Sequence, residues 1–312
     1  MTTGVFLGID VGGTSTSAGL VTAQGRVVLS RNRPTHGPGG GDAVPRLLAL
    51  AAEVAGLARP RGYRVVGVGA GVPGIVDGAT GAIRGEAHNV PELGGLPLAR
   101  LLTRALGVPA AVDNDVNALA LGEWTWGAGR GARSLVLLAL GTGVGGGIVL
   151  DGQLYRGAAG FGGELGHVPV KLDGRECVCG GRGCLKAYVA GPDLAAEGAR
   201  RLGRPVDTAE LFQLAGAGDA AAAAVVDEAL EALAAGLTII VNGLNPERLL
   251  LAGGIARALA PRAAELRARL ARRAYAGALA TTRLRFLSLD KQTTVRGGAA
   301  LARHAIRTGA RG

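Results

Sequence analysis

A pattern that occurs twice constrains the fold of this chain more than any other feature. Residues 5–28 read VFLGIDVGGTSTSAGLVTAQGRVV, and residues 135–154 read LVLLALGTGVGGGIVLDGQL. Each segment is an apolar run of strand length, a Gly/Thr loop, a second apolar run and a turn, which is AQG in the first segment and DG in the second. The repetition resembles an internal duplication and predicts two halves that each begin with a β-hairpin.

Apolar runs of strand length alternate with helical stretches along the rest of the chain, and this alternation indicates an α/β fold. The 312 residues are enough for two domains of ordinary size, and the 48% of hydrophobic residues can fill their cores. Aromatic residues make up only 3%, so Val, Leu, Ile and Ala must build these cores. We expect helices over residues 44–58, 96–106, 116–126, 218–241, 256–276 and 293–306, and strands over residues 63–74, 109–115, 247–252 and 283–289.

Composition also bears on location and partners. The chain lacks a stretch of about 18 uninterrupted apolar residues, and its N-terminal MTTGVFLGID has neither a basic start nor a long apolar run. We therefore expect a cytoplasmic protein with no membrane span and no signal peptide. The formal net charge is +10, but the arginines are scattered, without an aromatic-interleaved stripe or a helix-turn-helix signature. We expect no nucleic-acid partner.

Three glycine-rich loops follow apolar strands, at residues 10–14, 141–147 and 252–254. Glycines let a backbone approach a phosphate closely, and the turned N–H groups form a concavity for an anion. One such loop could be only a tight turn, but three at strand ends favour phosphate binding. None matches the GxxxxGK[ST] phosphate loop. The candidate residues are Gly12, Gly13, Thr14, Gly141, Thr142, Gly143, Gly253 and Gly254.

Carboxylates beside these loops are candidates for acid–base chemistry. Asp10 would repel a phosphate unless Mg²⁺ or a water of its hydration shell stood between them. The sequence VDNDVNA places Asp113, Asn114, Asp115 and Asn117 at a strand-to-helix junction. Asp115 could accept a proton during phosphoryl transfer to a hydroxyl, or it could only cap a helix that starts at Val116. Spacing alone leaves both interpretations open.

The motifs together resemble the ROK family of bacterial sugar kinases, repressors and open reading frames, which has the actin-like and hexokinase-like ATPase fold. The resemblance covers essentially the whole chain. It rests on residues 10–14, GVPG, DNDVNA, GTGVGGG, GELGH, the cysteine cluster and LAGGIA, which occur in the family's order.

This resemblance implies two lobes with ATP between them and a sugar in the cleft. We expect residues 1–117 with 293–312 to form the smaller lobe, and residues 118–292 to form the larger lobe, which would contain a zinc motif at His167, Cys177, Cys179 and Cys184. Asp115 matches the family's catalytic base, whereas Asp113 falls on a variable position. Asp10 and the three glycine loops would hold Mg²⁺ and ATP. The sugar-binding positions would be Gly74, Asn89, Asn114, Asp115, Glu164, His167 and Lys186.

A cysteine cluster contains every cysteine of the chain. His167, Cys177, Cys179 and Cys184 have the spacing H-x9-C-x-C-x4-C, and three thiolates with one imidazole suit a closed tetrahedral zinc site. No other cysteine is present to form a disulfide framework, and free buried cysteines are an improbable alternative for three in eight residues. The zinc would be structural, because protein ligands would fill all four positions.

The resemblance implies ATP-dependent phosphorylation of a hexose, with O6 of glucose as the first expectation and Asp115 as the general base. Other acceptors are fructose, mannose, N-acetylglucosamine and N-acetylmannosamine, and a non-catalytic sugar sensor is a further alternative. We expect no repressor, because only nine residues precede Asp10 in this sequence. Members of the family are commonly homodimers or homotetramers.

Lys186 departs from the family pattern, in which GCLE places a glutamate that accepts hydrogen bonds from sugar hydroxyls. A lysine has three donors and no acceptor. Either Lys186 turns to solvent and another group replaces the contact, or the substrate is altered or anionic.

Overall fold

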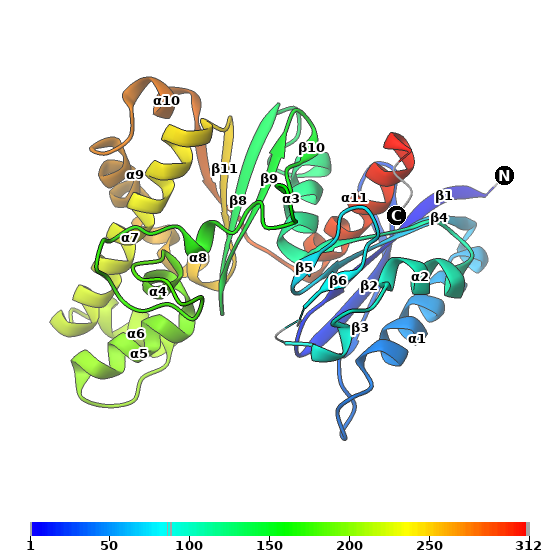
Figure 1. Cartoon of the computed structure of the whole chain (residues 1–312), viewed down its shortest axis with the longest axis horizontal. Helices are drawn as coiled ribbons and strands as arrows, with labels where there is room; N and C mark the ends of the chain where they lie inside the picture. Colours follow the sequence, from blue (N-terminus) through cyan, green and yellow to red (C-terminus); the bar gives the residue numbers. More distant parts are fainter. Residues whose placement is uncertain (1, 86, 88, 310–312) are drawn as a thin grey trace. The chain divides into compact units, whose positions relative to one another are not determined.

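The computed structural model describes residues 2–85, 87 and 89–309. By its internal contacts the chain divides into two compact units. Unit 1 comprises residues 1–132, 147–162 and 289–312, and unit 2 comprises residues 133–146 and 163–288. The lobe boundaries expected after residues 117 and 292 stay a prediction. The strands and helices of both units are labelled in Figure 1.

Unit 1 is built on a five-stranded sheet with the order β3-β2-β1-β4-β7. The β1–β2 and β2–β3 pairs are antiparallel, and the β1–β4 and β4–β7 pairs are parallel. The first predicted hairpin is therefore confirmed. The elements are β1 (Thr3–Val11), β2 (Ser15–Thr22), β3 (Val27–Pro34), α1 (Ala43–Gly56), β4 (Tyr63–Val72), β5 (Ile75–Val76), β6 (Ile83–Arg84), α2 (Leu98–Leu106), β7 (Ala110–Asn114), α3 (Asp115–Trp126) and α11 (Lys291–Thr308).

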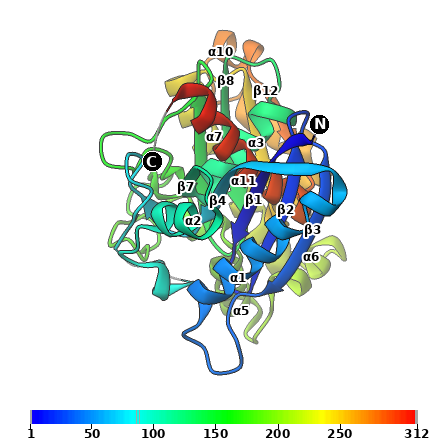
Figure 2. The same ribbon diagram turned by 90° about the vertical axis from the view of Figure 1, so that its right-hand side faces the viewer.

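Side chains of β1 alternate between the two faces of this sheet, as the pleat requires. Val5, Leu7 and Ile9 lie in the main core with α1 and α2, whereas Phe6 packs with Val295 of α11. Figure 2 shows α1 and α2 in front of the sheet, with α11 on the side away from the viewer. The alternation therefore places Phe6, Gly8 and Asp10 on the α11 face.

Glycines let α11 approach this face closely. A Cβ atom on Gly8 would lie 1.9 Å from the carbonyl oxygen of Val295, and one on Gly69 of β4 would lie 2.0 Å from the carbonyl oxygen of Gly298. These separations are far below van der Waals contact, so both positions require glycine for packing and not for a turn.

The second sheet has the order β10-β9-β8-β11-β12, and β8, β11 and β12 are parallel to one another. The neighbouring strands β8 and β9 correspond to the second predicted hairpin. The boundary between the units falls within β9, after Gly146. The elements are β8 (Ser134–Leu140), β9 (Val144–Leu150), β10 (Gln153–Leu154), α4 (Lys186–Val189), α5 (Gly191–Leu202), α6 (Thr208–Gly216), α7 (Ala220–Leu244), β11 (Arg248–Ala252), α8 (Gly254–Leu259), α9 (Ala263–Ala271), α10 (Ala276–Thr281) and β12 (Arg283–Phe286).

One predicted helix, over residues 256–276, is wrong as a single element. Helix α8 ends at Leu259, a 3-10 turn follows at Ala260–Arg262, and α9 ends at Ala271. Pro261 lies in that turn and has no N–H to continue an α-helical ladder.

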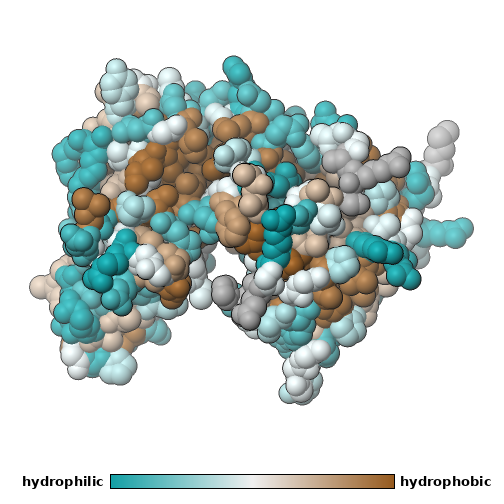
Figure 3. Space-filling view, viewed as in Figure 1, coloured by the Kyte–Doolittle hydropathy of each residue, from teal (hydrophilic) through white to brown (hydrophobic). Residues whose placement is uncertain are grey.

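In the parts of the chain that the structure covers, we find no helix both long enough and apolar enough to cross a bilayer. On the face drawn in Figure 3, hydrophilic side chains are spread over both units and do not gather over one element.

Candidate active site and metal centre

The candidate residues of unit 1 lie at the carboxyl ends of its three parallel strands. Asp10 is near the end of β1, Gly71 is near the end of β4, and Asn114 ends β7. A Cβ atom on Gly71 would lie 3.2 Å from the Cα atom of Asp115, so the start of α3 approaches β4 closely. The carboxyl edge of a parallel sheet is where ligands bind in open α/β folds.

The loop after β1 is held by Thr35, a buried residue that directly follows β3. Its hydroxyl donates to the carbonyl oxygen of Gly12 at 2.6 Å, and its N–H donates to the carbonyl oxygen of Thr14 at 3.0 Å. The N–H of Gly12 donates to the carbonyl oxygen of Ser15 at 3.1 Å, so the N–H groups of Gly13 and Thr14 are the candidates for contact with an anion.

Asp10 is a partly buried carboxylate beside the N-terminal turn of α11. Burial raises the pKa of the Asp10 carboxyl, against a hydrogen bond from Thr294 and the charge of Lys291, which lower it. Lys291 also donates from Nζ to the hydroxyl of Ser15 at 3.3 Å. A hard, oxygen-preferring cation such as Mg²⁺ suits this carboxylate, since it would offset the cost of burying the charge.

Asp115 is the first residue of α3, and the N-cap of that helix is Asn114, although the Asp115 carboxylate also accepts from the N–H of Val116 at 2.9 Å. The side-chain oxygen of Asn114 accepts hydrogen bonds from the N–H groups of Val116 and Asn117, at 2.9 and 3.3 Å. Desolvation, reinforced by the negative charge of Asp10, raises the pKa of Asp115 to about 7. A carboxylate with this pKa can accept a proton at neutral pH, which is the property of a general base.

Asp113 is buried on the other side of the same junction, with 2% of its surface exposed. Its carboxylate accepts from Nε of Arg156 at 2.6 Å, from the N–H of Asn114 at 2.8 Å and from Nδ2 of Asn117 at 2.9 Å. These partners occupy the carboxylate, so Asp113 supports the start of α3 and Asp115 remains the candidate base.

Two further predicted sugar-binding positions of unit 1 join this cluster. Asn114 donates from Nδ2 to the carbonyl oxygen of Gly74 at 3.1 Å, and Gly74 has a positive φ of 97°. Asn89 lies against the glycine loop that follows β1, since a Cβ atom on Gly13 would be 2.8 Å from its Cβ. Its neighbour His88 lies outside the described residues.

In unit 2, two glycine loops meet at the carboxyl ends of neighbouring parallel strands. Gly253 follows β11 with a φ of 97°, and a Cβ atom there would lie 2.4 Å from the carbonyl oxygen of Leu140, the last residue of β8. The loop after β8 begins at Gly141, whose carbonyl accepts from the N–H of Gly191 at 2.8 Å. Unit 2 thus repeats the arrangement of unit 1, with Gly141, Thr142, Gly143, Gly253 and Gly254 at one sheet edge.

The four predicted metal ligands come together in unit 2. One ligand atom from each of His167, Cys177, Cys179 and Cys184 lies within 4.8 Å of all the others. Nδ1 of His167 is 3.5 Å from Sγ of Cys177, and Sγ of Cys179 is 3.7 Å from Sγ of Cys184. Tetrahedral zinc would require about 3.6 Å between nitrogen and sulfur and about 3.8 Å between two sulfurs. The residues therefore fit zinc.

The three cysteines cannot all be thiolates unless a cation lies among them. A backbone N–H of Gly181, with neighbouring thiols, lowers the pKa of Cys179 to about 7. Burial, with the same neighbours, raises the pKa of Cys184 to about 12. Three thiolates this close require a positive charge among them, which Zn²⁺ supplies.

The metal loop is attached to the helices of unit 2 through Arg175. Its guanidinium lies 4.6 Å from the centre of the buried Tyr188 ring and donates to Glu228 at 2.7 Å, and its N–H donates to the Tyr188 hydroxyl at 2.9 Å. Glu228 also accepts from Arg201 of α5. This network joins the loop to α4, α5 and α7.

Glu164 and His167 occupy the same turn. Nε2 of His167 is 3.9 Å from a carboxylate oxygen of Glu164, while Nδ1 faces the cysteines. The Glu164 side chain is 45% exposed, so its carboxylate is free to accept from a ligand.

Lys186 is not directed freely to solvent. Its Nζ lies 2.9 Å from one carboxylate oxygen of Asp193, at the first turn of α5, and donates to the other at 3.3 Å. The Lys186 side chain is only 16% exposed. The positive charge is therefore largely neutralised within the protein.

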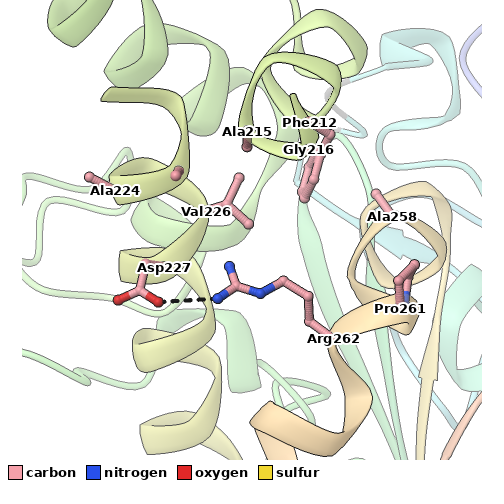
Figure 4. Close-up of a pocket in the computed structure, with 10 residues that line it drawn as sticks. Phe212, Ala215, Gly216, Ala224, Val226, Asp227, Ala258, Pro261 and Arg262 are labelled. Atoms are coloured by element: carbon pink, nitrogen blue, oxygen red, sulfur yellow. Dashed lines mark hydrogen bonds and ion pairs between the residues drawn. The ribbon is translucent and has the colours of Figure 1, made fainter. Parts of the chain in front are cut away.

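A separate cavity of about 660 Å³ lies among α6, α7, α8 and the following 3-10 turn. Figure 4 shows its apolar lining and the Asp227–Arg262 pair, whose atoms are 3.3 Å apart. None of the predicted nucleotide, sugar or metal residues lines it.

Several partners of the site carry no signal in a single sequence. Thr35, Arg156, Arg175 and Asp193 act through contacts with residues distant in the chain or on another element. The sequence shows that Thr35 can form hydrogen bonds and that the other three residues are charged. It does not show which residues they contact.

Comparison with known proteins gives consistent matches over the whole chain. A sequence profile of the ROK family matches residues 6–305. A glucokinase of Thermotoga maritima is 36% identical over 268 residues, which are 81% of this chain and 83% of that protein.

Two solved structures are similar in both fold and sequence. The ROK hexokinase from Thermus thermophilus is 35% identical, with a TM-score of 0.84 over 98% of this chain and 100% of that chain. A ROK family glucokinase from Streptomyces griseus, in complex with glucose and AMPPNP, is 29% identical, with a TM-score of 0.73 over 96% of this chain and 99% of that chain.

Proposed function

This chain belongs to the ROK family, and we propose that it is an ATP-dependent hexokinase whose first substrate is glucose. The observation that carries the proposal is Asp115, a carboxylate with a pKa raised to about 7 at the first turn of a helix whose N-cap is Asn114. The glucokinase of Thermotoga maritima and the Streptomyces griseus structure with glucose and AMPPNP support the choice of substrates.

In the proposed reaction Asp115 takes the proton of the glucose O6 hydroxyl. A bond forms between that oxygen and the γ-phosphorus of ATP, the bond from this phosphorus to the β–γ bridging oxygen breaks, and ADP leaves. The loops at Gly12–Thr14 and Gly141–Gly143 would donate N–H groups to the phosphates. Gly253 and Gly254 would contact the nucleotide at the end of β11.

Two metals have separate roles in this proposal. Mg²⁺, held through water by Asp10, would neutralise charge on the phosphates. Zn²⁺ would be structural, since His167, Cys177, Cys179 and Cys184 fill a tetrahedral set and leave no position for a reacting water. By fixing His167, the metal loop would also fix the turn that carries Glu164.

For sugar binding we propose Gly74, Asn89, Asn114, Glu164 and His167. The pairing of Lys186 with Asp193 favours a neutral sugar over an anionic one, because the lysine charge already has a carboxylate partner. If the lysine had altered the specificity, Lys186→Glu would raise activity on glucose relative to the wild type. Equal activity of the two proteins on glucose would indicate that another group replaces the sugar contact of the family's glutamate.

The decisive test is a coupled ADP-release assay with the wild type and Asp115→Asn. We expect the variant to lose turnover by several orders of magnitude while it still binds glucose in calorimetry. Near-normal turnover would show that Asp115 is not the base. The acceptor panel of glucose, mannose, fructose, N-acetylglucosamine and N-acetylmannosamine distinguishes a glucokinase from an amino-sugar kinase, and sugar binding without turnover on any acceptor would indicate a sensor.

We further propose a homodimer or homotetramer that works in the cytoplasm, where ATP is available. Light scattering during size-exclusion chromatography tests the number of subunits. The same assay with other nucleoside triphosphates tests whether ATP is the phosphoryl donor.

A further inference from the structure

A small pocket in unit 1 brings together two arginines that form no ion pair with any described residue. The pocket has a volume of about 230 Å³ and lies between the end of α3, the β9–β10 turn and the last two turns of α11. Its lining residues are Trp124, Thr125, Asp151, Gly152, Gln153, Arg303, His304, Arg307 and Thr308.

Two arginines of α11 lie at the positions i and i+4 and therefore on one face of the helix. Among the residues that the structure describes, neither the Arg303 nor the Arg307 guanidinium forms a hydrogen bond or an ion pair. Arg303 instead lies 5.7 Å from the centre of the Trp126 ring. Asp151 also lines the pocket, but it already has a partner of its own. The guanidinium donors are thus available to a ligand.

The electrostatic surroundings agree with an excess of positive charge. Burial, followed by the charges of Arg156, Arg307 and Arg303, lowers the pKa of His304. Its Nε2 lies 3.0 Å from the side-chain oxygen of Gln153. Burial and the charge of Arg307 also lower the pKa of Arg303. An anion in this pocket would relieve the repulsion among these groups.

The walls of the pocket are held in place without a ligand. Nε1 of Trp124 donates to the carbonyl oxygen of Ala132 at 2.8 Å, and a Cβ atom on Gly152 would come within 2.9 Å of the Trp124 ring. The hydroxyl of Thr308 donates to the carbonyl of His304 at 2.9 Å, which satisfies one acceptor of the last helical turn. A fixed shape with free donors is what a specific anion site requires.

We propose that this pocket binds a phosphate group, through Arg303 and Arg307, as a second ligand site of the protein. Guanidinium groups match the geometry of phosphate oxygens, and the volume suits inorganic phosphate or a sugar monophosphate. The site lies nine residues along α3 from Asp115, which is about 14 Å at the helical rise of 1.5 Å per residue. It is therefore separate from the base of the proposed reaction, although the same helix connects them.

The chain provides its own probe for this site. Its only tryptophans are Trp124, which lines the pocket, and Trp126, over which Arg303 lies. Intrinsic fluorescence should therefore change saturably when inorganic phosphate or glucose 6-phosphate is added in the absence of ATP. Glucose carries no charge, so the fluorescence change that it causes measures sugar binding at the proposed active site alone.

The test compares the wild type with the double variant Arg303→Gln, Arg307→Gln. We expect the Kd for the phosphate probe to rise at least tenfold. The matched control is Arg283→Gln, Arg285→Gln, which removes the same charge from exposed positions of β12 and should leave the Kd unchanged. The double variant Arg303→Lys, Arg307→Lys keeps both charges. If it still binds phosphate, the loss of binding in the double glutamine variant is due to the lost charges and not to unfolding.

The two probes identify the source of the phosphate. Equal affinities indicate a site for free phosphate, and tighter binding of glucose 6-phosphate that the double glutamine variant abolishes indicates a sugar phosphate. The proposal is overturned if neither probe gives a saturable change, or if the double glutamine variant binds like the wild type. Because no turnover is measured, a negative result here leaves the kinase proposal intact, and an inactive enzyme would leave this binding result intact.

Discussion

Removal of Arg156 should destabilise unit 1 far more than removal of an ordinary surface arginine. Asp113 is 2% exposed and its carboxylate lies 2.6 Å from both Nε and a terminal nitrogen of Arg156. Breaking a buried pair by removing one partner costs about 3–5 kcal/mol, because the other charge stays buried without compensation. The Arg156 side chain is 32% exposed, so water can partly replace it and we expect the lower end, about 3 kcal/mol. For a unit of this size that lowers Tm by roughly 6–12 °C.

A double-mutant cycle tests this reasoning. Arg156→Gln, Asp113→Asn and the combined variant are compared by urea unfolding, and the combined variant should be more stable than Arg156→Gln alone because no charge remains buried. Arg84→Gln is the control, since Arg84 pairs with Asp77 at the surface, with 51% of its side chain exposed, and should cost less than about 1 kcal/mol. Additive effects within the cycle, or an Arg156→Gln cost no larger than that of Arg84→Gln, would refute the argument.

Three other perturbations test separate parts of the structure. Because the pKa of Asp115 is raised to about 7, kcat should fall about tenfold per pH unit below pH 7 and level off above it, and a rate independent of pH between 5 and 7 would exclude it as the base. Cys179→Ser or chelation should lower Tm and glucose affinity together, and full affinity in protein verified as zinc-free by elemental analysis would contradict the structural role. Gly8→Ala should destabilise the protein by about 1–3 kcal/mol or more, whereas Gly243→Ala, where a Cβ meets nothing within 4 Å, should be neutral or stabilising in thermal unfolding.

The sequence could predict those elements that are defined by local pattern. The repeated apolar runs predicted β1 with β2 and β8 with β9, since both faces of these strands are largely buried. Strand β3 was not predicted, because only the VVL at its start is an apolar run, SRNRP follows it, and no residue of the strand is buried at this sheet edge. The chain after the cysteine cluster was expected to be strongly helical, but the bounds of α5 and α6 were not predicted from their short, mixed sequences. The local sequence pattern thus predicts buried strands better than it predicts strands at the edge of a sheet.

The candidate site shows the same limit at the level of side chains. Spacing placed Asp115 at a strand-to-helix junction but could not say whether it caps the helix, because Asn114 and Asp115 are both good capping residues. The structure decides this through the hydrogen bonds of Asn114. The partner of Asp113 is Arg156, 43 residues away, and the partner of Lys186 lies on the next helix. Such pairings depend on tertiary packing, which a single sequence does not contain.

The alternation of β1 connects the packing of unit 1 to the chemistry proposed for it. Gly8 and Asp10 are two residues apart and lie on one face, about 6.6 Å from each other at the strand rise of about 3.3 Å per residue. Gly8 brings the carbonyl of Val295 against the strand. The preceding turn of α11, with Lys291 and Thr294, must then lie beside Asp10, as its pKa indicates. The close approach that forbids a side chain at position 8 is therefore the same approach that buries Asp10. A cation bound by this carboxylate would consequently also stabilise the contact between β1 and α11.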